Sequence, residues 1–134
     1  MNPALAEFLQ DLAEFGQQND SVQQQRAQRM LNITPDTGEF LQVLVHATKS
    51  RQILEIGTSN GYSTLWLADA VQALAGQVIT LDYAADKVTM AAENFAKSGL
   101  QHLIQQVHGD AADYLKQAQS GSIELLFLDS ERSH

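Results

Sequence analysis

The sequence lacks cysteine and is poor in positive charge. The absence of cysteine excludes disulfide bonds and thiolate metal sites. Eight Lys and Arg residues stand against 16 Asp and Glu residues, which gives a formal net charge of -8. Such a chain has no general electrostatic attraction to nucleic acid or to anionic membranes. We therefore expect no nucleic-acid or membrane partner.

Long apolar runs are also missing. The sequence has no stretch of 18 apolar residues and no basic segment followed by an apolar one. Neither a transmembrane span nor a signal peptide is therefore predicted, and the expectation is a soluble, cytoplasmic protein. The 134 residues are enough for one domain with a hydrophobic core.

The stretch from residue 53 to 68 organises the rest of the chain. An apolar run, Ile53–Ile56, stops at a turn that contains Gly57 and Gly61, and a helical pattern begins at about Tyr62. This order of strand, tight turn and helix is typical of the start of a βαβ unit. The glycines let the backbone bend and a ligand approach closely. Ser63 and the free N–H groups of the first helical turn would offer hydrogen-bond donors to that ligand.

Glu55 places a carboxylate inside the apolar strand. Its burial costs free energy unless it meets a donor or a cation. A cationic, donor-rich ligand above the carboxyl end of the strand would supply both. The alternative is an ordinary strand-to-helix turn in which Glu55 accepts hydrogen bonds from backbone amides.

The first 50 residues predict three helices. The first begins at Asn2 and Pro3, which are typical of a helix cap and first turn, and the second runs from Asp20 to about Met30. Thr34 is expected to cap the third helix, with Pro35 at its first position. The apolar residues expected on the buried faces of the first and third helices are Leu5, Phe8, Leu9, Leu12, Phe15, Phe40, Leu41, Leu44 and Val45.

From residue 51 the pattern alternates between strand and helix, which predicts a parallel α/β sheet covered on both faces. Strands are expected at about 52–57, 77–82, 103–108 and 123–129, and helices at about 62–74, 86–97 and 110–119. In the second of these helices the residues expected to face inward are Val88, Ala91, Ala92 and Phe95. Trp66 is expected to pack in the core, and His108 is expected to be structural.

The pattern Glu55-x-Gly57-x-x-x-Gly61-Tyr62-Ser63 resembles the glycine-rich motif of S-adenosylmethionine (SAM)-dependent methyltransferases. It differs from the GxGxxG motif of NAD-binding folds. The Gly-Tyr-Ser ending is similar to the small O-methyltransferases that include the catechol and caffeoyl-CoA enzymes. The resemblance implies a Rossmann-like parallel sheet, with strand order 3-2-1-4 for the part present. It also implies methyl transfer to a hydroxyl of a small, catechol-like acceptor.

The resemblance assigns roles to particular residues. Asp82 would hold the ribose of SAM, although it could also be an ordinary strand-end aspartate. Asp110 and Ala111 would meet the adenine, or Asp110 could simply cap the next helix. The segment 30–41 resembles the family's entry loop. The complete set of implied cofactor-binding residues is Glu55, Gly57, Thr58, Gly61, Ser63, Asp82, Asp110, Ala111 and Asp129.

Asp129 is also the one residue that the resemblance suggests as a ligand of a divalent metal such as Mg²⁺. The family's other two metal ligands would lie beyond His134. Where many members have Asp-x-x-Lys with a candidate basic lysine, this chain has Arg132, which stays protonated and cannot accept a proton. No catalytic base is assigned.

Residues 1–134 are thus expected to form a single SAM-binding domain, C-terminally incomplete, with helices in 1–50 and a Rossmann-like half in 51–134. We expect this chain to transfer methyl groups slowly or not at all. Two alternatives are a nicotinamide-dependent oxidoreductase and a non-catalytic SAM-binding or oligomerising remnant. The apolar fourth strand would leave an unpaired edge, so self-association or a homo-oligomer is expected.

Overall fold

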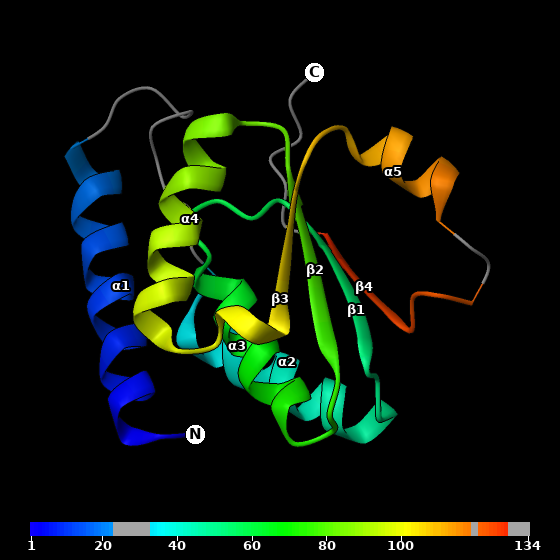
Figure 1. Ribbon diagram of the computed structural model, residues 1–134. Coiled ribbons are helices and arrows are strands. Elements are labelled where there is room, and N and C mark those ends of the chain that lie inside the picture. Colours follow the sequence, from blue (N-terminus) through cyan, green and yellow to red (C-terminus); the bar gives the residue numbers. More distant parts are fainter. Residues whose placement is uncertain (23–32, 119–120, 129–134) are drawn as a thin grey trace.

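A four-stranded parallel sheet runs through the middle of the molecule, with its strands in the order β3-β2-β1-β4 (Figure 1). The computed structural model describes residues 1–22, 33–118 and 121–128. The strand bounds are β1 Gln52–Ile56, β2 Gln77–Asp82, β3 Ile104–His108 and β4 Leu125–Leu128. The predicted α/β class and strand order are confirmed, and the strand limits agree with the prediction to within about two residues.

The helices lie on both sides of this sheet. They are α1 Pro3–Val22, α2 Pro35–Thr48, α3 Tyr62–Gln72, α4 Ala85–Ser98 and α5 Ala111–Gln117, and a short 3₁₀ helix covers Gln101–Leu103. Figure 1 shows α1, α3 and α4 on one side and α5, in orange, on the other. The helices are thus divided unequally between the two faces.

The predicted helix caps form as expected. The Asn2 side chain accepts a hydrogen bond from the backbone N–H of Ala4 at 2.7 Å. The Thr34 hydroxyl accepts one from the N–H of Thr37 at 3.2 Å, and Pro35 occupies the first position of α2. These bonds satisfy donors that the first turn of a helix leaves without an intrahelical partner.

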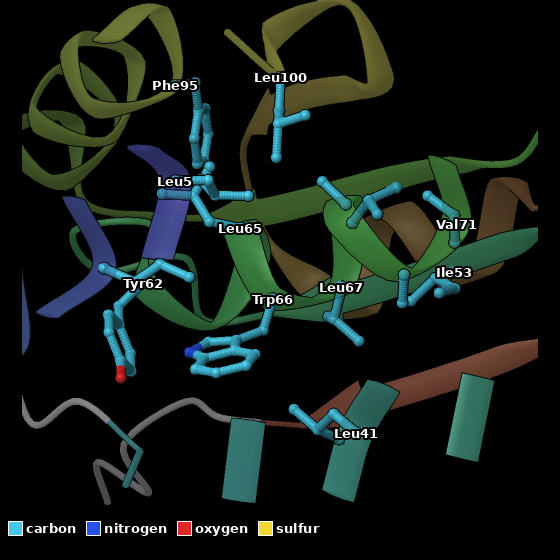
Figure 2. Packing of buried hydrophobic residues seen from close by; sticks show 14 of the residues in the cluster. Leu5, Leu41, Ile53, Tyr62, Leu65, Trp66, Leu67, Val71, Phe95 and Leu100 are labelled. Atoms are coloured by element: carbon cyan, nitrogen blue, oxygen red, sulfur yellow. The ribbon is translucent and has the colours of Figure 1, made fainter. Parts of the chain in front are cut away.

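The larger hydrophobic cluster lies between the sheet and α3, with α1, α2 and α4 packed around it. Figure 2 shows Tyr62, Leu65, Trp66 and Leu67 of α3 projecting into this cluster. Trp66 packs against α2 so closely that a Cβ atom on Gly38 would lie 2.4–2.7 Å from its ring. The prediction that Trp66 is a packing residue is confirmed.

The buried faces of three helices are narrower than predicted. Phe15 and Phe40 are 54% and 61% exposed, and Ala92 is exposed as well. Leu44 and Val88 are only partly buried. In α2 the buried residues are Gly38, Leu41 and Val45, because the contact between Gly38 and Trp66 sets the line along which α2 meets α3. Helical spacing alone could not locate that line.

The predicted start of a second helix at Asp20 is wrong. Asp20 and Ser21 belong to α1, which continues to Val22. No proline or glycine occurs between residues 17 and 22 to end the helix before this point. The rest of the predicted helix, 23–30, lies outside the described residues.

The opposite face of the sheet carries a small cluster of Leu54, Ile56 and Leu81, with Ala111 and Tyr114 of α5 packed against it. Along β4, burial alternates between partly buried and exposed residues, and Leu126 and Leu128 are 46% and 63% exposed. Among the described strands, β4 pairs only with β1. The expectation that this strand forms a sheet edge is confirmed for the described part of the chain.

Candidate functional site

The turn between β1 and α3 lies at the carboxyl ends of the parallel strands. Gly57, Ser59 and Gly61 have φ angles of 102°, 51° and 90°, in the left-handed region. The structure gives a packing reason for Gly61, because a Cβ atom there would lie 2.5 Å from the ring of Phe95 on α4. Gly61 therefore admits a core side chain as well as allowing the bend.

Glu55 is completely buried beneath this turn. The hydroxyls of Ser63 and Thr64 each donate to its carboxylate, and the Thr80 hydroxyl donates to Oε1 at 2.7 Å. Successive strand residues point to opposite faces, so Glu55 faces α3 together with Ile53. Three hydroxyls of α3 and β2 thus meet the buried carboxylate.

A fourth hydroxyl extends this hydroxyl cage around Glu55. The oxygen atoms of Thr58 and Thr80 are 2.7 Å apart. Since Thr80 gives its only hydroxyl hydrogen to Glu55, Thr58 is the donor to Thr80. Thr58 and Ser63 are 2% and 4% exposed, so both side chains stabilise the turn from inside. Sequence reasoning missed Thr64 and Thr80, although Thr80 stands opposite Glu55 in the sheet register.

Asp82, at the end of β2, holds two loops together. Its Oδ2 accepts a hydrogen bond from the backbone N–H of Ser59, and its Oδ1 accepts one from the N–H of Ala84, both at 3.0 Å. The turn is thereby fixed beside Asp82. A carboxylate can accept about four hydrogen bonds, so these two leave acceptor positions on a half-buried group.

The end of β3 lies next to Asp82 in the sheet register. Asp110 caps α5 by accepting a hydrogen bond from the N–H of Asp113 at 3.1 Å, as its alternative interpretation predicted. Ala111 contacts the smaller cluster under α5. The imidazole Nε2 of His108 lies 3.0 Å from the Tyr83 carbonyl oxygen, which agrees with a structural role.

Tyr62, the first residue of α3, is 2% exposed. Burial raises the pKa of its hydroxyl above the ordinary value of 10.0, while the neighbouring Trp66 side chain acts in the opposite direction. The two rings meet edge to face, with centroids 6.3 Å apart. Tyr62 therefore serves packing in this structure, at the very start of the helix that follows the turn.

The proposed metal ligand Asp129 lies outside the described residues, as do Arg132 and His134. Within residues 1–22, 33–118 and 121–128, no three His, Asp or Glu side chains gather in a way that would hold a metal ion. None of the described helices combines the length and apolar character needed to span a bilayer.

Comparison with known proteins identifies the family. The family described as "O-methyltransferase" matches residues 4–134. The chain belongs to this O-methyltransferase family. Two similar relatives are both named catechol O-methyltransferase. The one from Niastella koreensis is 34% identical over 76% of this chain, and the one from Mycobacterium tuberculosis is 33% identical over 76% of it.

Solved O-methyltransferase structures are similar along nearly the whole chain. The enzyme from Bacillus cereus in complex with S-adenosylhomocysteine (SAH) is 30% identical, with a TM-score of 0.72 over 97% of this chain. The enzyme from Streptomyces achromogenes in complex with SAM is 29% identical, with a TM-score of 0.72 over 97% of it. The match covers 47% and 46% of the two curated relatives and 55% and 54% of the two structures, so this O-methyltransferase chain spans about half their length.

Proposed function

We propose that this chain binds SAM at the β1–α3 turn and contributes to methyl transfer from SAM to a hydroxyl group of a small, catechol-like acceptor. The observation that carries the proposal is the hydrogen bond from the backbone N–H of Ser59 to Asp82, which fixes the turn beside that carboxylate. It brings the glycine-rich segment and the candidate ribose-binding acid together at one edge of the sheet. Family membership and the SAM-bound and SAH-bound structural neighbours support the choice of cofactor.

The residues present fit this cofactor in two respects. Asp82 is half-buried and keeps acceptor positions that suit the paired hydroxyls of a ribose. The side-chain amide nitrogen of Asn60, inside the turn, is buried without a hydrogen-bond partner. A polar ligand seated on the turn would use both groups.

Bound SAM would supply an electrophilic methyl group. The acceptor oxygen would bond to the methyl carbon as the carbon–sulfur bond breaks, and the acceptor's hydroxyl proton would pass to a base. Asp82 would orient the ribose. The buried carboxylate of Glu55 would hold the turn through its hydroxyl partners and place negative charge beneath the amino group of the cofactor. Alignment of this kind supplies much of the rate enhancement in a two-substrate reaction.

Three parts of the proposal extend beyond the residues around the turn. They are the catechol-like acceptor, a cytoplasmic location and a divalent cation at Asp129. Asp129 lies outside the described residues, and within them no three His, Asp or Glu side chains gather to hold a metal ion. A comparison of acceptor methylation with and without a chelator, in the complete protein, tests the cation.

The two alternatives are less well supported. The relatives are named O-methyltransferases, and the structural neighbours hold SAM or SAH, which favours a methyltransferase over an oxidoreductase or a remnant. In a thermal-shift experiment, we expect SAH to raise the unfolding temperature and NAD to leave it unchanged. Stabilisation by NAD alone would reverse this choice.

The ribose assignment is tested with Asp82→Ala. We expect it to weaken SAH binding by about 1–3 kcal/mol, the range for removing a buried hydrogen-bonding partner. Isothermal calorimetry measures the effect. The control is Asp86→Ala, which removes an exposed carboxylate from the first turn of α4 and should leave binding unchanged. Equal binding by wild type and Asp82→Ala would contradict the assignment, and absence of SAH binding by wild type would contradict the proposed function.

A further inference from the structure

Two side-chain donors in the described part of the chain are buried without a hydrogen-bond partner, Asn60 Nδ2 and Trp66 Nε1. The Trp66 nitrogen faces α2, where it would lie 2.7 Å from a Cβ atom on Gly38. Asn60 lies in the β1–α3 turn and is 1% exposed. A buried donor without an acceptor costs free energy, so native proteins rarely keep one without a reason.

The orientation of the Asn60 amide is determined by its other contact. Its Oδ1 accepts a hydrogen bond from the backbone N–H of Tyr62 at 3.1 Å. A backbone N–H can only donate, so the oxygen must face Tyr62 and Nδ2 must point the other way. The Asn60 carbonyl also accepts a hydrogen bond from Asn94 Nδ2 at 2.8 Å. Both contacts hold Asn60 in place and leave its two amide hydrogens without an acceptor.

The surroundings of this donor favour an anionic ligand group. The N-cap residue of α3 is Gly61, which has no side chain to cap the helix. The start of an 11-residue helix carries partial positive charge from its peptide dipoles. Ser59, on the other side of Asn60, donates to Asp82. In a ligand whose ribose is held at Asp82, the sulfur and the amino-acid group that follow the ribose would therefore lie beside Asn60.

We infer that the side-chain amide of Asn60 donates a hydrogen bond to the amino-acid carboxylate of bound SAM or SAH. This inference rests on the proposed function and assigns one part of the ligand to one residue. The carboxylate is the anionic group of that amino-acid portion. The cationic amino group and the sulfonium of SAM are disfavoured at the positive end of α3.

The test compares two ligands. One is SAH, and the other is 5′-methylthioadenosine, which keeps the adenosine and the thioether but has no amino-acid group. Asn60→Asp preserves the acceptor for the Tyr62 N–H and replaces the donor by a negative charge. By calorimetry, we expect it to weaken SAH binding about tenfold to a hundredfold and to change methylthioadenosine binding by less than about twofold.

A second variant guards against poor folding of the first. Asn60→Ser can still accept from the Tyr62 N–H, but its shorter side chain does not reach the position of Nδ2. It should weaken SAH binding about threefold to tenfold. It should not lower the unfolding temperature measured without ligand by loss of a hydrogen bond, because the donor that it removes has no partner there. The matched control is Asn94→Ala, which loosens the turn without removing the Asn60 amide and should affect both ligands to the same degree.

The outcomes distinguish the assignment of Asn60 from the proposed function. Selective loss of SAH binding in both Asn60 variants supports the assignment. Equal loss for both ligands would mean that Asn60 only shapes the turn, and no loss for either would mean that the donor faces away from the ligand; each overturns the inference while the proposed function stands. If wild type binds neither ligand, the proposed function fails, and the inference fails with it.

Discussion

On the side of the sheet that faces α3, the buried side chains come from α1, α2, α3, α4 and the strands, and many have no exposed surface. On the side that faces α5, the buried residues are Leu54, Ile56 and Leu81. Leu126 and Leu128 of β4 are exposed. The hydroxyl cage around Glu55 lies on the first side. The candidate site therefore lies on the better-packed side of the sheet, where small changes in side-chain packing cost the most free energy.

The largest expected effect contrasts one leucine from each side. Leu67 is fully buried on α3, whereas Leu128 on β4 is 63% exposed. Leu67→Ala should lower the free energy of unfolding by about 2–5 kcal/mol because it leaves a cavity. Leu128→Ala should change it by less than about 0.5 kcal/mol. Urea denaturation measures both, and similar losses would mean that the two faces are equally well packed.

A smaller loss is expected where α2 and α3 come closest. Gly38→Ala places a methyl group 2.4–2.7 Å from the Trp66 ring and should cost about 1–3 kcal/mol. Gly109→Ala is the control, because a Cβ atom there meets nothing within 4 Å. If chemical denaturation shows equal stability for the two variants, α2 can move away from α3 at little cost.

The hydroxyl cage is tested with Thr80→Val, which keeps the side-chain shape and removes the donor to Glu55. Because Glu55 and Thr80 are both fully buried, we expect a loss of about 1–2 kcal/mol in the free energy of unfolding. Thr89→Val is the control, since the exposed Thr89 hydroxyl donates only to a carbonyl of its own helix. Unchanged stability in Thr80→Val would show that the cage contributes little.

A weaker effect should appear at alkaline pH. Because burial raises the pKa of Tyr62, the unfolded chain loses this phenol proton first as pH rises above 10.0. The free energy of unfolding should then fall with increasing pH. Tyr62→Phe should reduce this fall, and Tyr83→Phe, at a residue that is 75% exposed, should not. Thermal unfolding at several pH values is the measurement; parallel curves for wild type and Tyr62→Phe would contradict the prediction.

The smallest effect on stability concerns the β4 edge. We propose that this chain self-associates through β4, because Leu126 and Leu128 are exposed there and β1 is its only neighbour among the described strands. Leu128→Lys should reduce association without loss of stability. Light scattering at several concentrations checks this, with Val43→Lys as the control on the 63% exposed Val43 of α2. A concentration-independent monomer would remove the proposal.

Local sequence signals determined much of the architecture. Alternating strand and helix patterns predicted the parallel sheet, and the resemblance predicted its order. The caps at Asn2 and Thr34 also formed as expected, since a cap depends on residues only a few positions apart. The placement of Asp82 beside the glycine-rich turn followed from strand adjacency, and the hydrogen bond from the Ser59 N–H confirms this proximity.

Tertiary structure alone decided which groups meet. The sequence showed that a buried Glu55 needs donors, but Thr80 is 25 residues away and reaches it only because β1 and β2 pair in one particular register. The same holds for Gly61, whose space is bounded by Phe95 of α4, and for Phe40, which stays exposed because α2 meets α3 along the line of Gly38. Helical and strand periods indicate which side of an element is apolar. They do not identify the residues that pack against that side, because the folded arrangement decides how far along the chain those residues lie.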